Sequence, residues 1–272
     1  MIKTIKLKFG RGSGLPSEEV VITPITVFVG PSNSGKSKVL SEIYYYCTNG
    51  QLNVTDVILE KIEFDRFTVE AGEEKIKKFT LQPRMGEALS PNHIILGKKG
   101  TRHQVPKQNL LDALQNPNQQ ANLFCQWYLS FNTLLLDGKS RINLIAQQSA
   151  GDLQQSPQTS FQVLFHDDAK RYEVRRIIYD AFGTYFVIDP TSLGQFRLRL
   201  SSRPPKTDIE ERGIHEEAVQ FHSKALPVEQ ASDGVKALTG IITEIIAGDP
   251  AILLIDEPEA FLYPPLAFKL GK

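Results

Sequence analysis

The chain has 272 residues, of which 41% are hydrophobic and 23% charged, a composition typical of a folded globular protein. Its 31 basic and 31 acidic residues cancel, which argues against a protein that mainly coats nucleic acid, although a local basic patch is compatible with this balance. The two cysteines, Cys47 and Cys125, form no CxxC pair, so a disulfide framework and a zinc site are both disfavoured.

The N-terminal residues 2–9 alternate apolar and polar side chains, a pattern that predicts a β-strand rather than the apolar block of a signal peptide. No apolar run approaches the roughly 18 residues that a membrane-spanning helix needs. We therefore expect a cytoplasmic protein without a membrane partner.

The hydrophobic pattern predicts alternating strands and helices along the rest of the chain. The short apolar run at residues 25–29, stopped by Gly30 and Pro31, is typical of a buried parallel strand. Gly183 is expected to end one of the helices. The other predicted elements are a strand over 20–22, a helix over 37–46, alternating stretches within 57–81 such as 76–81, a helix over 167–182, strands over 185–188 and 196–200, a helix over 232–247 and a strand over 251–255.

Four further segments are predicted from their turn and polar residues. Residues 86–120 are polar with several prolines and glycines, which predicts a long surface excursion. Asp137-Gly138 between two apolar runs predicts a β-hairpin over 133–145. Residues 147–158 and 203–215 are predicted to be exposed loops.

Residues 30–37 read Gly-Pro-Ser-Asn-Ser-Gly-Lys-Ser and match the pattern G-x-x-x-x-G-K-[ST] in full. In this phosphate loop, consecutive backbone N–H groups wrap a polyphosphate and the following helix presents its positive end to the anion. Lys36 is expected to reach the β and γ phosphates, and the Ser37 hydroxyl to coordinate Mg²⁺. Chance would produce this pattern in about one per cent of chains of this length. The predicted ATP-binding residues here are Gly30, Pro31, Ser32, Asn33, Ser34, Gly35, Lys36, Ser37 and Lys38.

Two carboxylates, Asp256 and Glu257, follow the apolar run at 252–255. A buried strand would deliver them to the carboxyl edge of a sheet, where ligands of open α/β folds bind. We predict that Asp256 helps to hold Mg²⁺ and that Glu257 is the general base, with Lys36 as the other catalytic residue. The alternative for Glu257 is a role in capping a helix.

The tripeptide Ser232-Asp233-Gly234 opens the helix predicted over 232–247. Ser232 is a good helix N-cap, and capping would explain it structurally. A helix start with serine and glycine is also suited to bind a γ-phosphate, so Ser232 and Gly234 are candidate ATP contacts. The spacing alone does not decide between the two.

Four features follow one another along the chain: the phosphate loop, a long insertion, Ser-Asp-Gly opening a helix, and then the run Ile-Leu-Leu-Ile-Asp-Glu-Pro-Glu-Ala-Phe-Leu-Tyr-Pro-Pro. Over about residues 20–45 and 225–268 the chain resembles the ABC-type ATPases of the SMC-like and overcoming-lysogenization-defect (OLD) group, bacterial AAA-family proteins of DNA repair and phage defence. The resemblance implies an α/β P-loop head with a mixed β-sheet flanked by helices and a β-rich and helical insertion. It divides the chain into an ATP-binding lobe over 1–50 and 185–272 and an insertion over 51–184.

The resemblance also implies a homodimer formed around ATP. Residues 232–234 would be a divergent signature motif that contacts the γ-phosphate of ATP held by a second subunit, and residues 258–262 would lie at the dimer interface. A nuclease or other effector, or DNA, is a further expected partner. We therefore expect an ATP-driven head that regulates an effector or acts on DNA.

This chain departs from the group's pattern in three places. Tyr263 stands where the group has histidine. The group's switch histidine follows the carboxylate motif, but all five histidines here precede Asp256 and only sixteen residues follow it, so we expect a shortened chain that binds ATP and hydrolyses it poorly. The group has a glutamine that contacts Mg²⁺, and in this chain the candidates for that role are Gln82 and Gln126.

Two other functions are compatible with the phosphate loop. One is the nucleotide-binding subunit of an ABC transporter, against which stands Ser-Asp-Gly in place of Leu-Ser-Gly-Gly-Gln. The other is an interaction module that binds nucleotide without hydrolysing it. A turnover measurement with and without DNA distinguishes the three.

Overall fold

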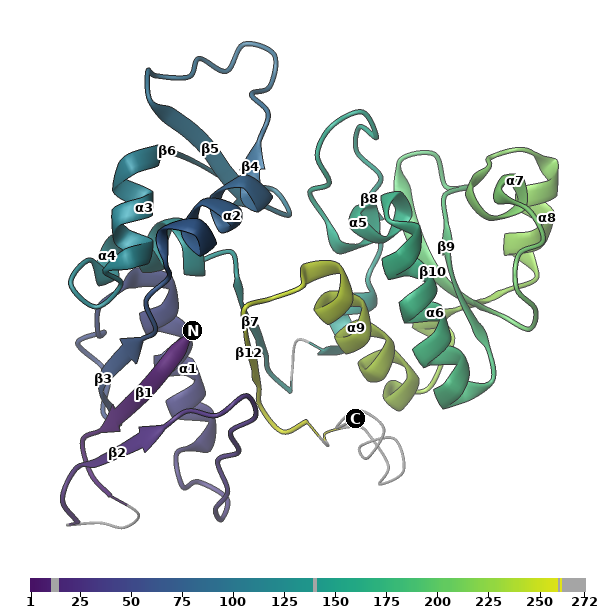
Figure 1. The fold of residues 1–272 in the computed structure, drawn as a ribbon. Helices are drawn as coiled ribbons and strands as arrows, with labels where there is room; N and C mark the ends of the chain where they lie inside the picture. Colours follow the sequence, from purple (N-terminus) through teal and green to yellow (C-terminus); the bar gives the residue numbers. More distant parts are fainter. Residues whose placement is uncertain (11–14, 139–140, 259, 261–272) are drawn as a thin grey trace. The chain divides into compact units, whose positions relative to one another are not determined.

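The computed structural model describes residues 1–10, 15–138, 141–258 and 260. The chain divides into two compact units, each with its own core. Unit 1 contains residues 1–135 and 250–256, and unit 2 contains residues 136–249 and the segment from 257 onward. Figure 1 labels the helices and strands of both units. The predicted division of the chain into an ATP-binding lobe over 1–50 and 185–272 and an insertion over 51–184 stays a prediction.

Unit 1 is built from short antiparallel sheets and helices. β1 is the middle strand of the sheet β2-β1-β3, in which Ile5 pairs with Val20 on one side and Ile62 on the other. A second sheet has the order β4-β5-β6. The strands are β1 (Ile2–Leu7), β2 (Glu18–Val21), β3 (Leu59–Phe64), β4 (Thr80–Leu81), β5 (His93–Lys98), β6 (Thr101–Pro106) and β12 (Ile252–Ile255), and the helices are α1 (Lys36–Asn49), α2 (Val69–Phe79), α3 (Lys107–Gln115), α4 (Ala121–Phe124) and the π-helix η1 (Cys125–Leu129).

The core of unit 1 places α1 against β12. Val39 and Ile43 of α1 are buried in the same cluster as Ile252 and Leu254 of β12, and the two elements contact each other. β12 also pairs with β7 (Thr133–Leu136) in a two-stranded sheet. The helix that follows the phosphate loop and the strand that precedes Asp256 therefore belong to one hydrophobic core.

Unit 2 packs helices on an antiparallel sheet in which β10 is the central strand and pairs with β8, β9 and β11. Asp167 caps the start of α6 through Lys170 N, and Gly183 ends that helix with φ 70°. The elements are η2 (Arg141–Ile145), β8 (Gln148–Ser149), α5 (Ser160–His166), α6 (Asp168–Phe182), β9 (Tyr185–Asp189), β10 (Gln195–Ser201), α7 (Asp208–Arg212), α8 (Glu216–Ser223), β11 (Leu226–Pro227), η3 (Val228–Gln230) and α9 (Asp233–Gly248).

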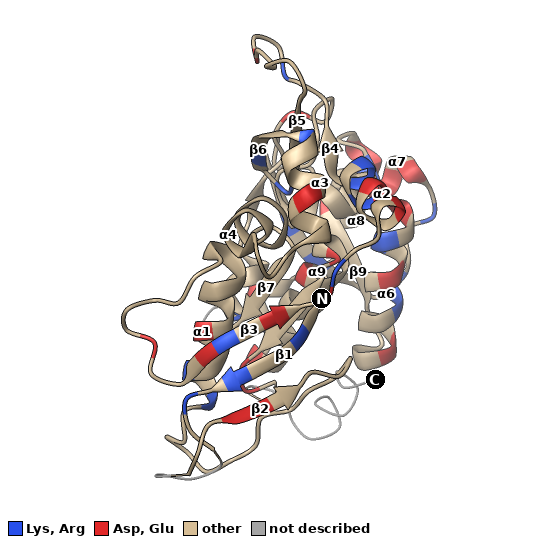
Figure 2. Ribbon diagram, turned by 60° about the vertical axis from the view of Figure 1, so that its left-hand side comes forward, with Lys and Arg blue, Asp and Glu red and all other residues tan. Residues whose placement is uncertain are grey.

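Charged residues of both signs lie along β3 and α6, whereas the charged residues of β1 are lysines (Figure 2). On the sheet of unit 1, Lys6 pairs with Glu60 at 2.6 Å. On α6, Arg176 pairs with Glu173 at 2.7 Å. Exposed pairs of this kind contribute little to stability, typically about 0–1 kcal/mol each.

Long, strongly periodic segments form the predicted elements. The strand predicted over 2–9 is β1, the helix over 37–46 is α1, and the helix over 167–182 is α6. The last three predicted strands and the helix before the carboxylates also form, as β9, β10, β12 and α9. Apolar spacing decided these elements because each buries one face in the core of its unit.

The segment over 25–29 contradicts the prediction of a buried strand. Ile25, Val27 and Val29 are 79%, 73% and 87% exposed, while Phe28 packs against the core. Among the described residues no strand pairs with this segment, so only one of its faces is covered. An apolar run is compatible with a buried strand, but the segment becomes one only where other strands pair with it within a sheet.

Three other predictions for the insertion are wrong. Residues 76–81 are the end of α2 and the short β4, because Gly72, Ile76 and Phe79 recur at helical spacing and are buried. The polar segment 86–120 holds the β5–β6 hairpin and α3 rather than one surface excursion. Residues 141–145 form the 3₁₀ helix η2, so the Asp137-Gly138 turn does not join two strands.

Two further expectations need correction. The loop over 203–215 contains α7, in which Glu210 and Glu211 are buried. Within the described ranges the strands form four separate small sheets instead of one mixed sheet flanked by helices, and β1, β5 and β10 each pair antiparallel with their neighbours. The coarser α/β class is correct.

Candidate nucleotide-binding site

The phosphate loop joins the extended segment 25–29 to the start of α1. Two of its residues have left-handed backbone conformations, Asn33 with φ 63° and Gly35 with φ 91°. Gly35 is the N-cap residue of α1 and supplies no side chain to cap the helix. The first amides of the helix therefore have no side-chain cap, which is the arrangement that anion-binding helix starts use.

At both glycines of the loop a side chain would lie close against a neighbouring side chain. A Cβ built at Gly30 would lie 2.8 Å from Oγ of Ser34. At Gly35 a Cβ would lie 2.8 Å from Cδ1 of Ile58, and the positive φ would strain any other residue. The loop thus keeps its backbone uncovered at both ends, which fits the close approach of a polyphosphate to consecutive N–H groups.

Lys36 lies over the loop itself. Its ammonium donates to the carbonyl oxygens of Gly30 and Pro31, each at 2.8 Å. Phosphate oxygens are better acceptors for an ammonium than neutral carbonyls are, so the side chain already lies where a bound phosphate could replace these contacts. The side chains of Ser32, Asn33, Ser34 and Ser37 are exposed.

Lys38, the last residue of the predicted binding run, forms an ion pair with Glu42 one turn along α1, at 3.5 Å. Glu42 is 1% exposed, and its carboxylate accepts backbone N–H groups of the segment before β3, at 2.9 Å from Val57, 3.1 Å from Ile58 and 2.7 Å from Leu59. Burial raises the pKa of this carboxyl, but the three amides and Lys38 outweigh that effect and hold the pKa below its usual range. Sequence analysis missed Glu42, because an acid within a helix gives no sign of such a role.

Asp256 directly follows β12 and is half-buried. It belongs to unit 1, as the phosphate loop does, and the α1–β12 contact lies in their shared core. Among the described residues no cluster of three or more His, Cys, Asp or Glu side chains is present. The two predicted metal ligands, Asp256 and Ser37, would supply one carboxylate and one hydroxyl oxygen, which fits Mg²⁺ because this ion keeps several of its waters.

Glu257 has an unusual backbone conformation, with φ 49°. Its carbonyl oxygen accepts two hydrogen bonds, from the backbone N–H of Ala260 at 2.8 Å and from Nη1 of Arg141 at 2.6 Å. Its side chain is exposed, and a Cβ built at Gly138 would lie 3.5 Å from Oε2. Arg141 was not among the predicted site residues, because the sequence around it was interpreted as a hairpin.

Ser232 occupies the N-cap position of α9, as predicted, but its side chain accepts no hydrogen bond from the helix amides. The residue is exposed and Gly234 is half-buried. Ser232 thus does not form the side-chain hydrogen bond by which a capping serine stabilises a helix. Ser232, Gly234 and Glu257 belong to unit 2, whereas the phosphate loop and Asp256 belong to unit 1.

The two candidates for the Mg²⁺-contacting glutamine make other contacts than with the phosphate loop. Gln126 donates weakly to the carbonyl of Asn49 at 3.5 Å, at the far end of α1. That end is about 20 Å along the helix axis from Lys36 at 1.5 Å per residue. Gln82 is exposed, and its carbonyl accepts a hydrogen bond from Arg102. Tyr263 and most of 258–262 lie outside the described residues.

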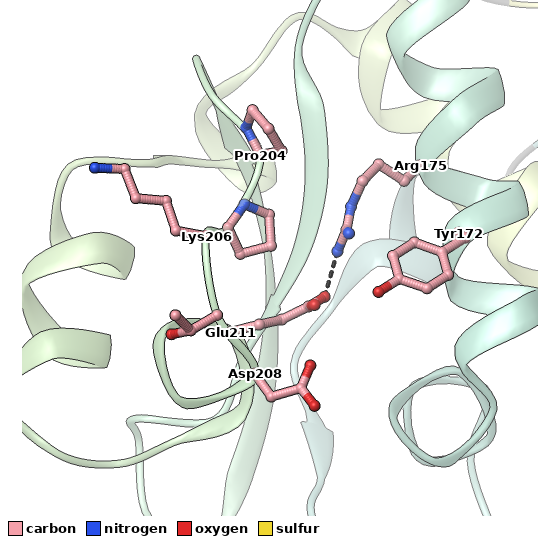
Figure 3. Close-up of a pocket in the computed structure, with 8 residues that line it drawn as sticks. Tyr172, Arg175, Pro204, Lys206, Asp208 and Glu211 are labelled. Carbon is pink, nitrogen blue, oxygen red and sulfur yellow. Dashed lines mark hydrogen bonds and ion pairs between the residues drawn. The ribbon is translucent and has the colours of Figure 1, made fainter.

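A separate cavity of about 360 Å³ opens in unit 2 and contains none of the predicted site residues. Figure 3 shows Tyr172 and Arg175 on one side and the segment from Pro204 to Asp208 on the other, with Glu211 bonded to Arg175. Glu211 also accepts from Nε of Arg171 at 2.8 Å. Two of the charged residues that line this cavity, Arg175 and Glu211, are thus paired with each other, which is typical of a structural ion cluster.

Residues 154–272 match the family described as AAA domain, putative AbiEii toxin, Type IV TA system. The match supports an AAA-type P-loop ATPase. It includes Ser232, Asp256 and Glu257 and lies downstream of the phosphate loop, which the complete motif at 30–37 identifies independently. No curated protein and no solved structure matches the chain.

Because AAA domains are generally ATPases that use ATP and Mg²⁺, the match supports nucleotide binding and ATP hydrolysis as general activities of such a domain. The residues predicted for these activities lie in two parts of the sequence that are far apart, the loop at 30–37 and the carboxylates at 256–257. In the described part of the chain, no helix has the length and apolar character needed to cross a membrane.

Proposed function

We propose that the chain binds ATP with Mg²⁺ at residues 30–37 and Asp256 and hydrolyses it with Glu257 as general base. The observation that carries the proposal is the common core of α1 and β12 in unit 1. That core joins the helix that begins at Lys36 to the strand that ends just before Asp256. This shared core supports the proposal, because a P-loop ATPase brings two such motifs, here separated by more than 200 residues of sequence, to one nucleotide.

Each residue of the loop has a distinct task in this proposal. The backbone amides after Gly30 bind the phosphates, and Lys36 exchanges its carbonyl partners for β- and γ-phosphate oxygens. Ser37 and Asp256 would hold the metal, which supplies charge neutralisation between the β and γ phosphates when bound. Lys38 supports the site indirectly, through its pair with Glu42.

The reaction is hydrolysis of the terminal phosphoanhydride. The oxygen of a water molecule forms a bond to the γ-phosphorus as the bond between that phosphorus and the β–γ bridging oxygen breaks. ADP leaves with the electron pair of the broken bond, and Glu257 accepts the proton of the water. Inorganic phosphate is the second product.

We further propose that two chains associate around ATP through the start of α9. Ser232 is exposed and its hydroxyl is not used by its own helix, so it is available to a phosphate held by another subunit. Gly234 beside it would let the backbone approach closely. In this arrangement residues 258–262 lie at the interface.

The role of such a head is to regulate an effector or a DNA-processing activity in the cytoplasm, of the DNA-repair or phage-defence type. The order of motifs supports this proposal, and so does the matching family, whose description names a putative toxin and a type IV TA system. A transporter subunit would instead need a membrane partner, and a signature of Leu-Ser-Gly-Gly-Gln is absent from the sequence.

Calorimetry with ATP and Mg²⁺, together with a phosphate-release assay, tests the proposal. We expect binding that Lys36→Ala weakens at least about tenfold, since a charge-assisted contact is lost. Lys61→Ala, which removes an exposed lysine paired with Glu63, is the matched control and should bind as the parent does. Equal affinity of the parent and Lys36→Ala contradicts the site, and ATP binding without any turnover identifies a non-hydrolysing module instead.

A further inference from the structure

Arg141 is a fully buried arginine at the start of η2. Removing a guanidinium from water is costly, and a buried one is kept only where its N–H groups are used. One of these groups donates to the carbonyl oxygen of Glu257 at 2.6 Å, across 116 residues of sequence. Arg141 and Glu257 both belong to unit 2.

The residue that receives this hydrogen bond has a strained backbone. Glu257 lies in the left-handed region with φ 49°, which residues other than glycine avoid because Cβ crowds the neighbouring backbone. Such a conformation persists only where the surroundings enforce it, and it is found mainly at functional sites. The bond from Arg141 and the bond from Ala260 N hold the carbonyl group of this residue, so its backbone is fixed on both sides of that peptide.

The surroundings of Arg141 hold it in turn. A Cβ built at Gly240 of α9 would lie 2.8 Å from the carbonyl oxygen of Arg141 and 2.9 Å from Cβ of Leu144, so α9 packs closely on η2 only because residue 240 is glycine. Gly138, three residues before Arg141, lies beside the Glu257 carboxylate. One short segment thus contacts both the backbone and the side chain of Glu257.

We propose that Arg141 is a positioning residue for the catalytic base. It holds Glu257 in the left-handed conformation and thereby fixes the direction in which the carboxylate points. The proposal rests on the proposed role of Glu257 in ATP hydrolysis and adds a residue that the motifs do not contain. Arg141 itself acts through the main chain of Glu257 and has no direct role in binding ATP.

A double-mutant cycle on turnover and ATP affinity tests this role. Arg141→Met keeps the length of the side chain but removes its donors, and it should lower kcat about tenfold or more, because small misplacements of a base are costly. The Kd for ATP should stay within about twofold of the parent, since the phosphate loop and Lys36 determine it. Arg141→Lys, which retains one charged donor, should recover part of kcat.

The same substitution in a Glu257→Gln background identifies how Arg141 acts. If Arg141 works through Glu257, adding Arg141→Met to Glu257→Gln lowers the residual rate no further. A loss by the same factor in both backgrounds overturns the proposal, as does an unchanged kcat in Arg141→Met. The matched control is Lys170→Met, which removes another cation from a main-chain carbonyl in unit 2, that of Ala247 at 3.2 Å, and should leave kcat unchanged.

Thermal unfolding provides a second test that does not depend on turnover. Glu257→Gly removes the strain of the left-handed conformation, so we expect it to raise the Tm of the parent by about 2 °C. In the Arg141→Met background the backbone is free to relax, and the same change should leave the Tm unchanged or lower it. An equal change in Tm in both backgrounds overturns the proposal. If the two changes in Tm differ but the protein hydrolyses no ATP, the result contradicts the proposed function and leaves the role of Arg141 in positioning Glu257 intact.

Discussion

The buried carboxylate of Glu42 on α1 accepts a 2.7 Å hydrogen bond from the backbone N–H of Leu59, where β3 begins. The amides of Val57 and Ile58 bond to the same carboxylate. These bonds hold the segment before β3 against α1, and Ile58 in that segment is the residue that a Cβ at Gly35 would strike. Glu42 therefore holds a segment that lies against Gly35, from about two helical turns further along α1.

Glu42→Gln should destabilise unit 1, because the amide keeps one acceptor oxygen and places an NH₂ group where backbone donors point. We expect a loss of about 1–3 kcal/mol in the free energy of unfolding, the range for unsatisfied buried polar groups. Denaturant unfolding measures it, with Glu60→Gln as a control at a partly exposed site. Equal stability of Glu42→Gln and the parent would show that the three amides find other partners.

Gly35→Ala should weaken both folding and ATP binding, because residue 35 has φ 91° and the new methyl group would lie 2.8 Å from Ile58. Gly183→Ala is the matched control, since φ there is also positive at 70° but nothing lies within 4 Å of the new Cβ. Strain alone costs about 1 kcal/mol or more at each site. The clash is specific to Gly35, so calorimetry should show reduced ATP affinity only there.

Glu257→Gln should lower kcat strongly, by two orders of magnitude or more on the scale of general-base catalysis, and leave ATP affinity nearly intact. The carboxylate acts when the water is attacked, whereas ATP is held by the loop. Phosphate release and calorimetry on the same preparation measure the two effects. Glu229→Gln, at an exposed site in η3, is the control. Turnover of Glu257→Gln at the parent rate would remove Glu257 from the role of base.

Ser232→Arg should abolish an ATP-dependent dimer, because a bulky side chain would replace the exposed hydroxyl that a second subunit's phosphate is proposed to meet. Sedimentation of a Glu257→Gln protein with and without ATP reveals the dimer, since slow turnover preserves bound ATP. Ser223→Arg introduces the same side chain at another exposed serine, on α8, and should dimerise normally. A dimer that survives Ser232→Arg would place the interface elsewhere.

The ion pair of Arg203 with Glu210 predicts acid sensitivity in unit 2. The guanidinium of Arg203 and the backbone N–H of Lys206 lower the pKa of Glu210 to about 2, despite the opposing effect of burial. Because the folded-state pKa lies below the usual 4.5, the stabilisation is complete above about pH 4.5 and is lost as the pH falls towards 2. In Glu210→Gln the Tm should be lower at neutral pH and fall less between pH 5 and 3. Parallel pH curves would contradict the assignment.

Within the fold, local pattern was sufficient where a segment buries a single face. α6 has Asp167 and Gly183 at its ends and apolar residues at helical spacing, so caps and periodicity agree. It was insufficient at residues 25–29, 76–81 and 133–145. Apolar or alternating residues there fit more than one element, and the neighbours that bury them come from distant parts of the chain.

By itself the sequence determined which chemistry is proposed for the site, because a phosphate loop needs particular residue types at fixed positions and residues 30–37 match all of them. It also determined that two acids follow an apolar strand at 252–255. Only the tertiary structure decided that α1 and β12 share a core, that Glu42 accepts a hydrogen bond from Leu59 and that Arg141 donates one to the carbonyl of Glu257. The physical reason is that these relationships join residues from 17 to more than 200 positions apart. Burial and hydrogen bonding between such residues depend on how the chain packs rather than on any local pattern.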